Sequence, residues 1–581
     1  MEDRIFMQKT FSQRLLPVAL SVLLFQLCII ANNLIVANFV GNDGLAVMSL
    51  VNPVYFSFTT IGALLSVGGA TLAGHNLGKN NLQAVDRSFS VSLLLVLSFG
   101  VVFIIIGFLT MEPLLTLLGV PAELRSMSKA YLLAYFPGAL AIMGIYIPFN
   151  YLKLVGKQNL TVYLFLLLAL FNISLDLLFV LFFSWGITGV AAATSISFWL
   201  VFLIGIYSLC GKKGEFHFIR PRAVGQDDLA IFKLGSPSAT NNLCNLLRVF
   251  CLNLLLLSAL GQGGLTAFSV VATVTAFSMS FLNGTAMTLT TFVGVFSGER
   301  DNESLRQVFR YALSYGLSAI AVFVAALMIF APQLCYLFKV TDPQLQAMAV
   351  HAVRIFALSL LPALANFVFI AFHQSNKQTL LANILTVSRS FALIVFSALV
   401  LSKAVGGEAI WFAFLVAELL TLFLALAASR VLGKQQKLSP TLLLNTSYED
   451  NGKYIAFSVP ADNLSVAESA MRITEFCEQN ELSPKKTMTI GLAIEEILVS
   501  FNKHALSGSQ QSEQANVRIL IHEDIVILRF RCGGKQFDPI GAAAKEEDFL
   551  ADSMGIKMLQ KLADTVVYTH TFGVNNLTIT L

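Results

Sequence analysis

Four ionisable side chains lie well inside long apolar stretches of this sequence: Asp176, Arg248, Arg389 and Glu418. A charged group at membrane depth is costly, so each of the four needs a structural or functional reason. Asp176 follows Asn172 by one helical turn, which places both side chains on one helix face. A carboxyl group buried there holds its proton more readily than in water and can exchange it, or can bind Na⁺ together with carbonyl oxygens. The alternative is a carboxyl group that is only hydrogen-bonded to neighbouring helices.

Asparagines in the first long apolar stretch lie at a depth similar to that of Asp176. Asn32, Asn33 and Asn38 could therefore line one polar cavity together with Asn172 and Asp176. Three methionines could line a broad apolar cavity, because flexible thioethers adapt to varied ligands: Met48, Met279 and Met287.

Glu418 and Arg389 fall near the middle of consecutive apolar stretches. One hypothesis is a structural ion pair in which each group neutralises the other. The other is a protonatable Glu418 that faces a central path. Arg248 has no evident partner in the sequence, and we assign it no role.

Composition places most of the chain in a membrane. Apolar residues make up 56% of the 581 residues and charged residues only 12%, and the small, dispersed net charge of +4 does not indicate nucleic-acid binding. The seven cysteines form no CxxC pair, so we expect neither a metal site nor a disulfide framework. Apolar runs of about 20 residues predict twelve helical spans: 14–40, 45–74, 88–111, 127–153, 159–183, 186–210, 229–260, 263–297, 307–331, 344–372, 378–402 and 406–430.

The spans form two copies of one unit. A constant shift of 220 positions carries Gly41 to Gly261 and Gly78 to Gly298. The same shift relates further pairs, including Pro17 and Pro237, Asn33 and Asn253, and Gly74 and Gly294. Paired repeats are typical of transporters, whose substrate path lies between the repeats. Asn253, as the counterpart of Asn33, joins the residues predicted to line the path.

Lys and Arg gather in the even-numbered loops, so we expect both termini in the cytoplasm. Residues 453–581 contain no span, and their alternating and helical patterns predict a cytoplasmic α+β domain. The predicted organisation is an N-terminal six-helix lobe, an inter-lobe linker, a C-terminal six-helix lobe, a second linker and the soluble domain: 1–210, 211–228, 229–434, 435–452 and 453–581.

The first 430 residues resemble the multidrug and toxic compound extrusion (MATE) family. The likeness rests on the twelve spans and on three motifs: FVGNDGLAVMSLVNPV with GGATLAGHNLGKNN, LGSPSATNN, and NISLD. The resemblance implies antiport, in which H⁺ or Na⁺ enters as an organic cation leaves. It also implies an ion-coupling role for Asn172 and Asp176. The aspartate of the family's first span maps onto Asn33, which as an amide cannot take up a proton in that way.

The soluble domain resembles GHKL ATPases, especially anti-sigma-factor serine kinases, through IGLAIEEILVSFNKHA, RCGGKQFDP and DSMGIKMLQKLADTVVY. Glu496 matches the family's base, while Gly534 and Gly555 match its glycines. Ser500 stands where the family has a Mg²⁺-binding Asn, and Cys532 where it has an adenine-binding Asp. With these two ligands changed, we expect a degenerate regulatory or partner-binding module, with ATP hydrolysis improbable and ATP or Mg²⁺ binding doubtful.

Together these observations predict a secondary-active exporter of drugs or other organic cations in the cytoplasmic (inner) membrane. It needs H⁺ or Na⁺ as coupling ion and no cofactor, and a cytoplasmic regulatory protein is a possible partner of its soluble domain. One alternative is a flippase or exporter of a lipid-linked or polar metabolite. A second is a membrane sensor that signals through the soluble domain.

Overall fold

The computed structural model describes residues 3–211, 215–220, 225–338, 342–445, 452–460, 462–506, 514–522, 525–545 and 554–581. Within them, eleven helices are long and apolar enough to cross a membrane. The longest, α10 (Gln226–Gly298), is two helices joined at Gly261, whose φ of 64° interrupts the helical backbone. Counting its halves separately gives the twelve predicted spans. Parts of the predicted linkers 211–228 and 435–452 lie outside the described residues.

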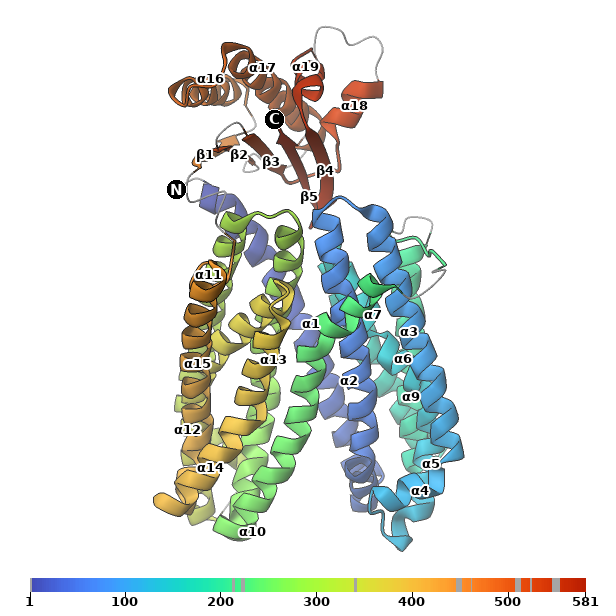
Figure 1. The fold of residues 1–581 in the computed structure, drawn as a ribbon. Coiled ribbons are helices and arrows are strands. Elements are labelled where there is room, and N and C mark those ends of the chain that lie inside the picture. The colour runs from blue at the N-terminus through green and yellow to red at the C-terminus, as the bar shows by residue number, and fades with distance from the viewer. Residues whose placement is uncertain are drawn as a thin grey trace.

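The helices form two lobes (Figure 1). The N-lobe contains α1 (Asp3–Phe39), α2 (Asn42–Gly78), α3 (Leu82–Leu109), α4 (Met111–Leu117), α5 (Ala122–Tyr135), α6 (Ala139–Gly144), α7 (Tyr146–Leu154), α8 (Gln158–Leu177) and α9 (Gly186–Cys210). The C-lobe contains α10, α11 (Asn302–Leu337), α12 (Pro343–Ser375), α13 (Thr379–Val387), α14 (Leu393–Ala404) and α15 (Phe412–Gln436). Short 3₁₀ or π turns interrupt several spans: η1 (Phe136–Gly138), η2 (Leu178–Phe182), η3 (Ser388–Ala392) and η4 (Gly407–Trp411).

The lobes meet tightly at the end of the bundle where α1 begins and α2 ends, which we call the domain-side end. There α2 packs against both halves of α10 through glycines. A Cβ at Gly68 would collide with the carbonyl oxygen of Ile231, and one at Gly235 with that of Leu64. Gly78 and Gly298 approach each other equally closely. Backbones can come this near only where no side chain stands between them.

The C-terminal domain sits on the domain-side end (Figure 1). Its five strands form one antiparallel sheet in the order β1-β2-β3-β5-β4, with β1 (Lys453–Pro460), β2 (Gln514–His522), β3 (Ile525–Cys532), β4 (Thr565–Thr571) and β5 (Val574–Thr580). Helices α16 (Asn463–Gln479), α17 (Pro484–Ser500) and α19 (Met554–Leu562) share one apolar core with the sheet. A π turn, η5 (Phe501–Ala505), continues α17, and α18 (Pro539–Lys545) follows β3.

Strand burial shows that both faces of this sheet are covered. In β3, the alternate residues Leu528 and Phe530 pack toward the helices. Arg529 and Arg531 point the other way and contact the membrane bundle. The predicted hairpin forms between β2 and β3, although Glu523 and Asp524 at its turn lie outside the described residues.

Candidate functional site

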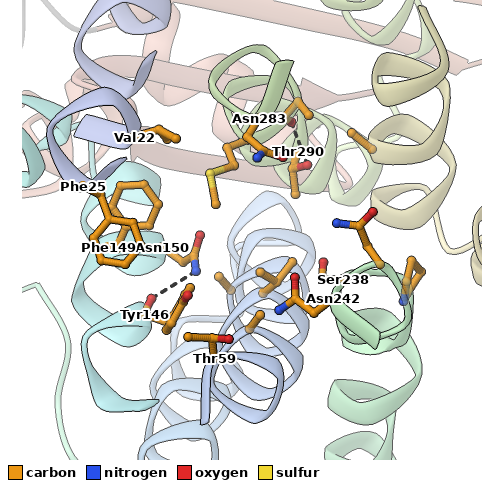
Figure 2. Close-up of a pocket in the computed structure, with 18 of the residues that line it drawn as sticks. Val22, Phe25, Thr59, Tyr146, Phe149, Asn150, Ser238, Asn242, Asn283 and Thr290 are labelled. Atoms are coloured by element: carbon orange, nitrogen blue, oxygen red, sulfur yellow. Dashed lines mark hydrogen bonds between the residues drawn. The ribbon is translucent and has the colours of Figure 1, made fainter. Parts of the chain in front are cut away.

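A cavity of about 500 Å³ lies between the lobes. Its N-lobe wall comes from α1, α2, α7 and α8, with Ile145 immediately before α7, and its C-lobe wall comes from α10, α12, α13 and η3. Figure 2 shows side chains from both walls pointing into the space between them. A pocket of this size can enclose a drug-sized molecule.

Aromatic rings form much of the N-lobe wall. Phe165 packs edge-on against Phe25, with ring centroids 5.4 Å apart, and against Phe149 at 4.9 Å. Tyr55 and Tyr146 continue this surface. Such a wall offers a large apolar contact area at fixed positions, which suits ligands with a flat or bulky apolar body.

Amide side chains supply most of the cavity's polarity. Asn150 donates to Ser66 Oγ at 2.9 Å, and Gln374 donates to the Leu234 carbonyl oxygen at 2.8 Å, so both help to hold helices together. Four other lining amides make no hydrogen bond within the described residues, and their donors and acceptors remain open to a ligand or water: Gln26, Asn52, Asn242 and Asn283.

Arg389 and Glu418 form a buried two-pronged ion pair. Arg389 Nη2 lies 2.6 Å from Glu418 Oε1, and Arg389 Nε lies 3.2 Å from Oε2. Asn366 donates to Oε2 at 2.7 Å, and the Arg389 guanidinium lies 4.1 Å from the centre of the Phe367 ring. Arg389 belongs to a π turn, η3, a feature frequent at functional sites. Of the two sequence hypotheses for this pair, the geometry matches the structural ion pair, and its arginine also lines the cavity.

Asp176 and Asn172 lie in the interior of the N-lobe and are not among the residues that line the cavity. Both are fully buried. Asn172 donates to Thr194 Oγ1 at 3.4 Å and accepts from Cys28 Sγ at 3.4 Å. Neither carboxylate oxygen of Asp176 has a hydrogen-bond partner among the described residues. A buried carboxylate without donors is strongly disfavoured, so this site suits a group that binds a proton or a cation.

The structure does not bring the five predicted polar residues of the N-lobe together. Asn32 does approach the buried group, because its Nδ2 lies 3.4 Å from Thr194 Oγ1. Asn33 is exposed and shares a helix face with Ile29 and Gln26 of the cavity wall, one turn or more beyond them. Asn38 is exposed and donates to the Leu34 carbonyl oxygen of its own helix.

Of the other residues predicted to line the cavity, one does so and three lie elsewhere. Met287 lines the cavity. Met48 and Met279 are half-buried elsewhere in the lobes, and Asn253 is exposed near the far end of the first half of α10. The lining asparagines Asn241 and Asn242 lie within the LGSPSATNN motif, whose helical register would have pointed to them.

A second cluster of charges joins the C-terminal domain to the C-lobe. We call it the arginine cage: Arg518, Arg529 and Arg531 of the sheet around Glu299 and Asp301 between α10 and α11. Asp301 oxygens lie 2.8 Å from Arg518 Nη1, 3.1 Å from Arg529 Nη1 and 2.9 Å from Arg531 Nη2. Glu299 Oε2 lies 2.6 Å from Arg531 Nη2. Burial alone would raise the pKa of Asp301, but Arg529, Arg518 and Arg531 outweigh it and hold that pKa well below its ordinary value.

The turn between β4 and β5 inserts into the junction of the two lobes. Phe572 and Gly573 both have positive φ, 59° and 64°, as in the tightest hairpin turns, where asparagine and glycine are usual. The Phe572 ring is buried, with its centroid 4.5 Å from that of Phe292 of the C-lobe. On the N-lobe side, Arg14 lies 5.9 Å from the same ring, and a Cβ at Gly156 would collide with the backbone of the turn.

The nucleotide-like residues of the C-terminal domain are arranged differently from a phosphate site. The Glu496 carboxylate accepts hydrogen bonds from the backbone N–H groups of Gly555 at 2.8 Å and Ile556 at 2.9 Å. A helix N-terminus is where a phosphate would bind, and here the protein's own carboxylate occupies it. Cys532 is buried beside Asn575, 3.7 Å from its amide.

The remaining positions add no ligand for a nucleotide. Gly534 has φ 94° and no room for a side chain, and Ser500 is half-buried. No group of three or more metal-binding side chains occurs in the described part of the chain. Within the described residues, Ser500 and Cys532 do not supply the Mg²⁺ and adenine ligands that an ATP site of this family would need.

Comparisons with known proteins agree with this architecture. The MatE family model matches residues 17–178 and 237–399, one segment in each lobe and together more than half of the chain. The model of the histidine kinase-like ATPase domain matches residues 459–581. The chain is 23% identical over 341 residues to the probable multidrug resistance protein YoeA of Bacillus subtilis, covering 57% of this chain and 73% of the relative. It is 21% identical over 367 residues to the multidrug export protein MepA of Staphylococcus saprophyticus, covering 62% and 80%.

Solved structures show the same fold. A multidrug resistance MATE family transporter in an outward-facing conformation superimposes with a TM-score of 0.70 at 23% identity, covering 74% of this chain and 97% of the other. A MATE structure in a bent conformation gives a TM-score of 0.68, also at 23% identity.

Two helical lobes with a cavity between them are an architecture typical of membrane transporters. The chain belongs to the MatE family of multidrug efflux transporters, and it carries a histidine kinase-like ATPase domain at its C-terminal end.

Proposed function

We propose that this protein exports amphiphilic organic molecules by alternating access through the central cavity, in exchange for H⁺ or Na⁺. The observation that carries the proposal is the cavity itself, which lies between two lobes that seal tightly at the domain-side end. In the orientation predicted from the Lys and Arg distribution, that seal faces the cytoplasm. In this orientation, the conformation is closed on its cytoplasmic side.

Asp176 is the coupling residue in this proposal. Its carboxylate has no hydrogen-bond partner in the described part of the chain, so it can gain a proton or cation without breaking a contact seen there. Glu418 is less suited because Arg389 and Asn366 already hold both of its oxygens. Asn172 lies one helical turn away on the same helix face, where it bonds to Cys28 and Thr194.

Proteoliposome transport of a fluorescent amphiphile under imposed pH or Na⁺ gradients tests export and its coupling ion. We expect gradient-driven transport by the native protein and its loss in Asp176→Asn. The Asn38→Ala variant is a matched control, because Asn38 is exposed and bonded only to its own helix. Gradient-insensitive movement of every amphiphile tested, at full reconstitution, would contradict secondary-active export.

We further propose that the C-terminal domain regulates transport by docking across both lobes. The arginine cage attaches it to the C-lobe, and Phe572 lies between Phe292 of the C-lobe and Arg14 of the N-lobe. A domain that contacts both lobes stabilises only the relative lobe position that fits it. We expect variants that release the domain to change the transport rate without changing which molecules are bound.

A further inference from the structure

The charge of the cavity wall identifies the class of molecule that it accepts. The residues that line the cavity include seven amides and several hydroxyl groups but no carboxylate, and their one guanidinium belongs to Arg389. Asp176 is not among the residues that line the cavity.

Arg389 keeps part of its hydrogen-bonding capacity for a ligand. Its Nε and Nη2 donate to Glu418, whereas Nη1 makes no hydrogen bond in the described residues. The face of the guanidinium is fixed against the Phe367 ring, 4.1 Å away, so its free edge is held in place. Guanidinium groups held in this way bind carboxylates and phosphates well.

A second cation stands directly behind the opposite wall. Lys153 is buried, and its Nζ donates to Asn150 Oδ1 at 3.0 Å and lies 4.1 Å from the centre of the Phe149 ring. Asn150 and Phe149 both line the cavity. Lys153 forms no ion pair with a carboxylate among the described residues, and a nearby anion would favour its protonated form.

The cavity therefore has Arg389 in one wall and Lys153 behind the other, and Glu418 is the one carboxylate that bonds to either of them among the described residues. In a low-dielectric site such an imbalance attracts an anion and repels a cation.

We propose that the central cavity binds amphiphiles that carry a carboxylate or phosphate, with the anion between Arg389 and Lys153 and the apolar body on the aromatic wall. This proposal rests on the export function proposed above and names its cargo. It replaces the organic cation expected from the family resemblance. The anionic group could belong to a soluble organic acid or to a lipid headgroup, because both present the same chemistry.

Binding of two matched fluorescent probes to the purified full-length protein in nanodiscs tests the proposal. The probes are 1-pyrenebutyrate and 1-pyrenebutyltrimethylammonium, which share one apolar body and differ in charge. In phosphatidylcholine nanodiscs, we expect the carboxylate to bind at least tenfold more tightly. Replacing phosphatidylcholine by phosphatidylglycerol distinguishes the two sources: competition with 1-pyrenebutyrate indicates a lipid headgroup, and its absence a soluble acid.

Two variants separate the effect of charge from that of folding. Asn242→Asp places a carboxylate in the cavity wall, and we expect it to reverse the preference between the probes. Asn38→Asp makes the same change outside the cavity and should leave the preference unaltered. The double variant Arg389→Gln/Glu418→Gln keeps a hydrogen-bonding pair and should reduce the preference for the anion by about tenfold. Tighter binding of the cationic probe by the native protein would overturn the anion proposal alone, whereas failure of both probes to bind would count against export through this cavity.

Discussion

Replacing Asp301 by asparagine should release the C-terminal domain from the membrane bundle. Asp301 is fully buried and forms ion pairs with all three arginines of the cage. It also caps α11 by accepting from the Ser304 backbone N–H at 3.1 Å. Asparagine is an equally good helix cap, so the substitution removes the charge and keeps the cap.

The structure sets the size of the effect. The cage holds three guanidinium groups against two carboxylates, so the substitution doubles the uncompensated positive charge in a buried interface. Removing one partner from a buried ion pair costs about 3–5 kcal/mol. At about 1.4 kcal/mol per factor of ten, this lowers the docked-to-undocked ratio by roughly two to three and a half orders of magnitude.

Hydrogen–deuterium exchange measures this loss. Amides of residues 292–304 and of the β4–β5 turn should exchange about 10²- to 10³-fold faster in Asp301→Asn. Peptides from the core of the domain, such as 490–498, should be unaffected. The matched control is Glu303→Gln, because Glu303 is partly exposed and its ion pair with Arg306 spans 3.7 Å. Exchange that is unchanged in Asp301→Asn, or equally fast in Glu303→Gln, would refute the role of the cage.

Further predictions concern docking, coupling and the seal between the lobes. Phe572→Asn keeps a residue suited to the positive φ but removes the buried ring; it should weaken docking by about 2–4 kcal/mol, seen as faster exchange of residues 292–296. Because docking lowers the pKa of Asp301, the docking free energy that Asp301 contributes is complete above the ordinary carboxyl pKa near 4. It is lost only as the pH falls through the lowered pKa. Hydrogen exchange corrected for intrinsic rates should therefore show no Asp301-dependent loss of docking between pH 5 and 8. Glu418→Gln should lower the thermal unfolding temperature more than Asp176→Asn does, because only Glu418 neutralises a buried arginine. Gly68→Ala should open the seal, because the added Cβ collides with the Ile231 carbonyl oxygen. Greater labelling of a cysteine engineered into α2 would measure this opening.

Hydropathy and the repeat could predict the two lobes because both are properties of long stretches. The apolar runs gave the spans, and the matched glycines marked where α2 and α10 must approach. The positive φ of Gly261 interrupts the helical backbone of α10 between the spans predicted at 229–260 and 263–297. The small sheet followed from alternating residues, which the paired strands confirm.

Side-chain direction was harder to predict. Adjacent residues on a helix point about 100° apart, so Asn32 and Asn33 cannot both face the buried group, and the sequence does not say which one does. The arginine cage was also missed, because its partners lie more than 200 residues apart. The sequence contained a pattern for the arginines but none for their acidic partners. Arg518 pairs with Arg529 across the hairpin and Arg531 follows two positions later, so all three lie on one face of the sheet.

Under the regulation proposed above, docking of the hairpin turn at Phe572 would depend on the relative position of the two lobes. Free-energy coupling is reciprocal, so a docked domain that favours one lobe arrangement must itself be released more often when cargo favours another. The transport rate would then determine the fraction of molecules in which the sheet face bearing Arg518, Arg529 and Arg531 is exposed. The fraction of an acidic partner bound to this face would then rise with the transport rate. By the same reciprocity, the concentration of that partner would change the transport rate.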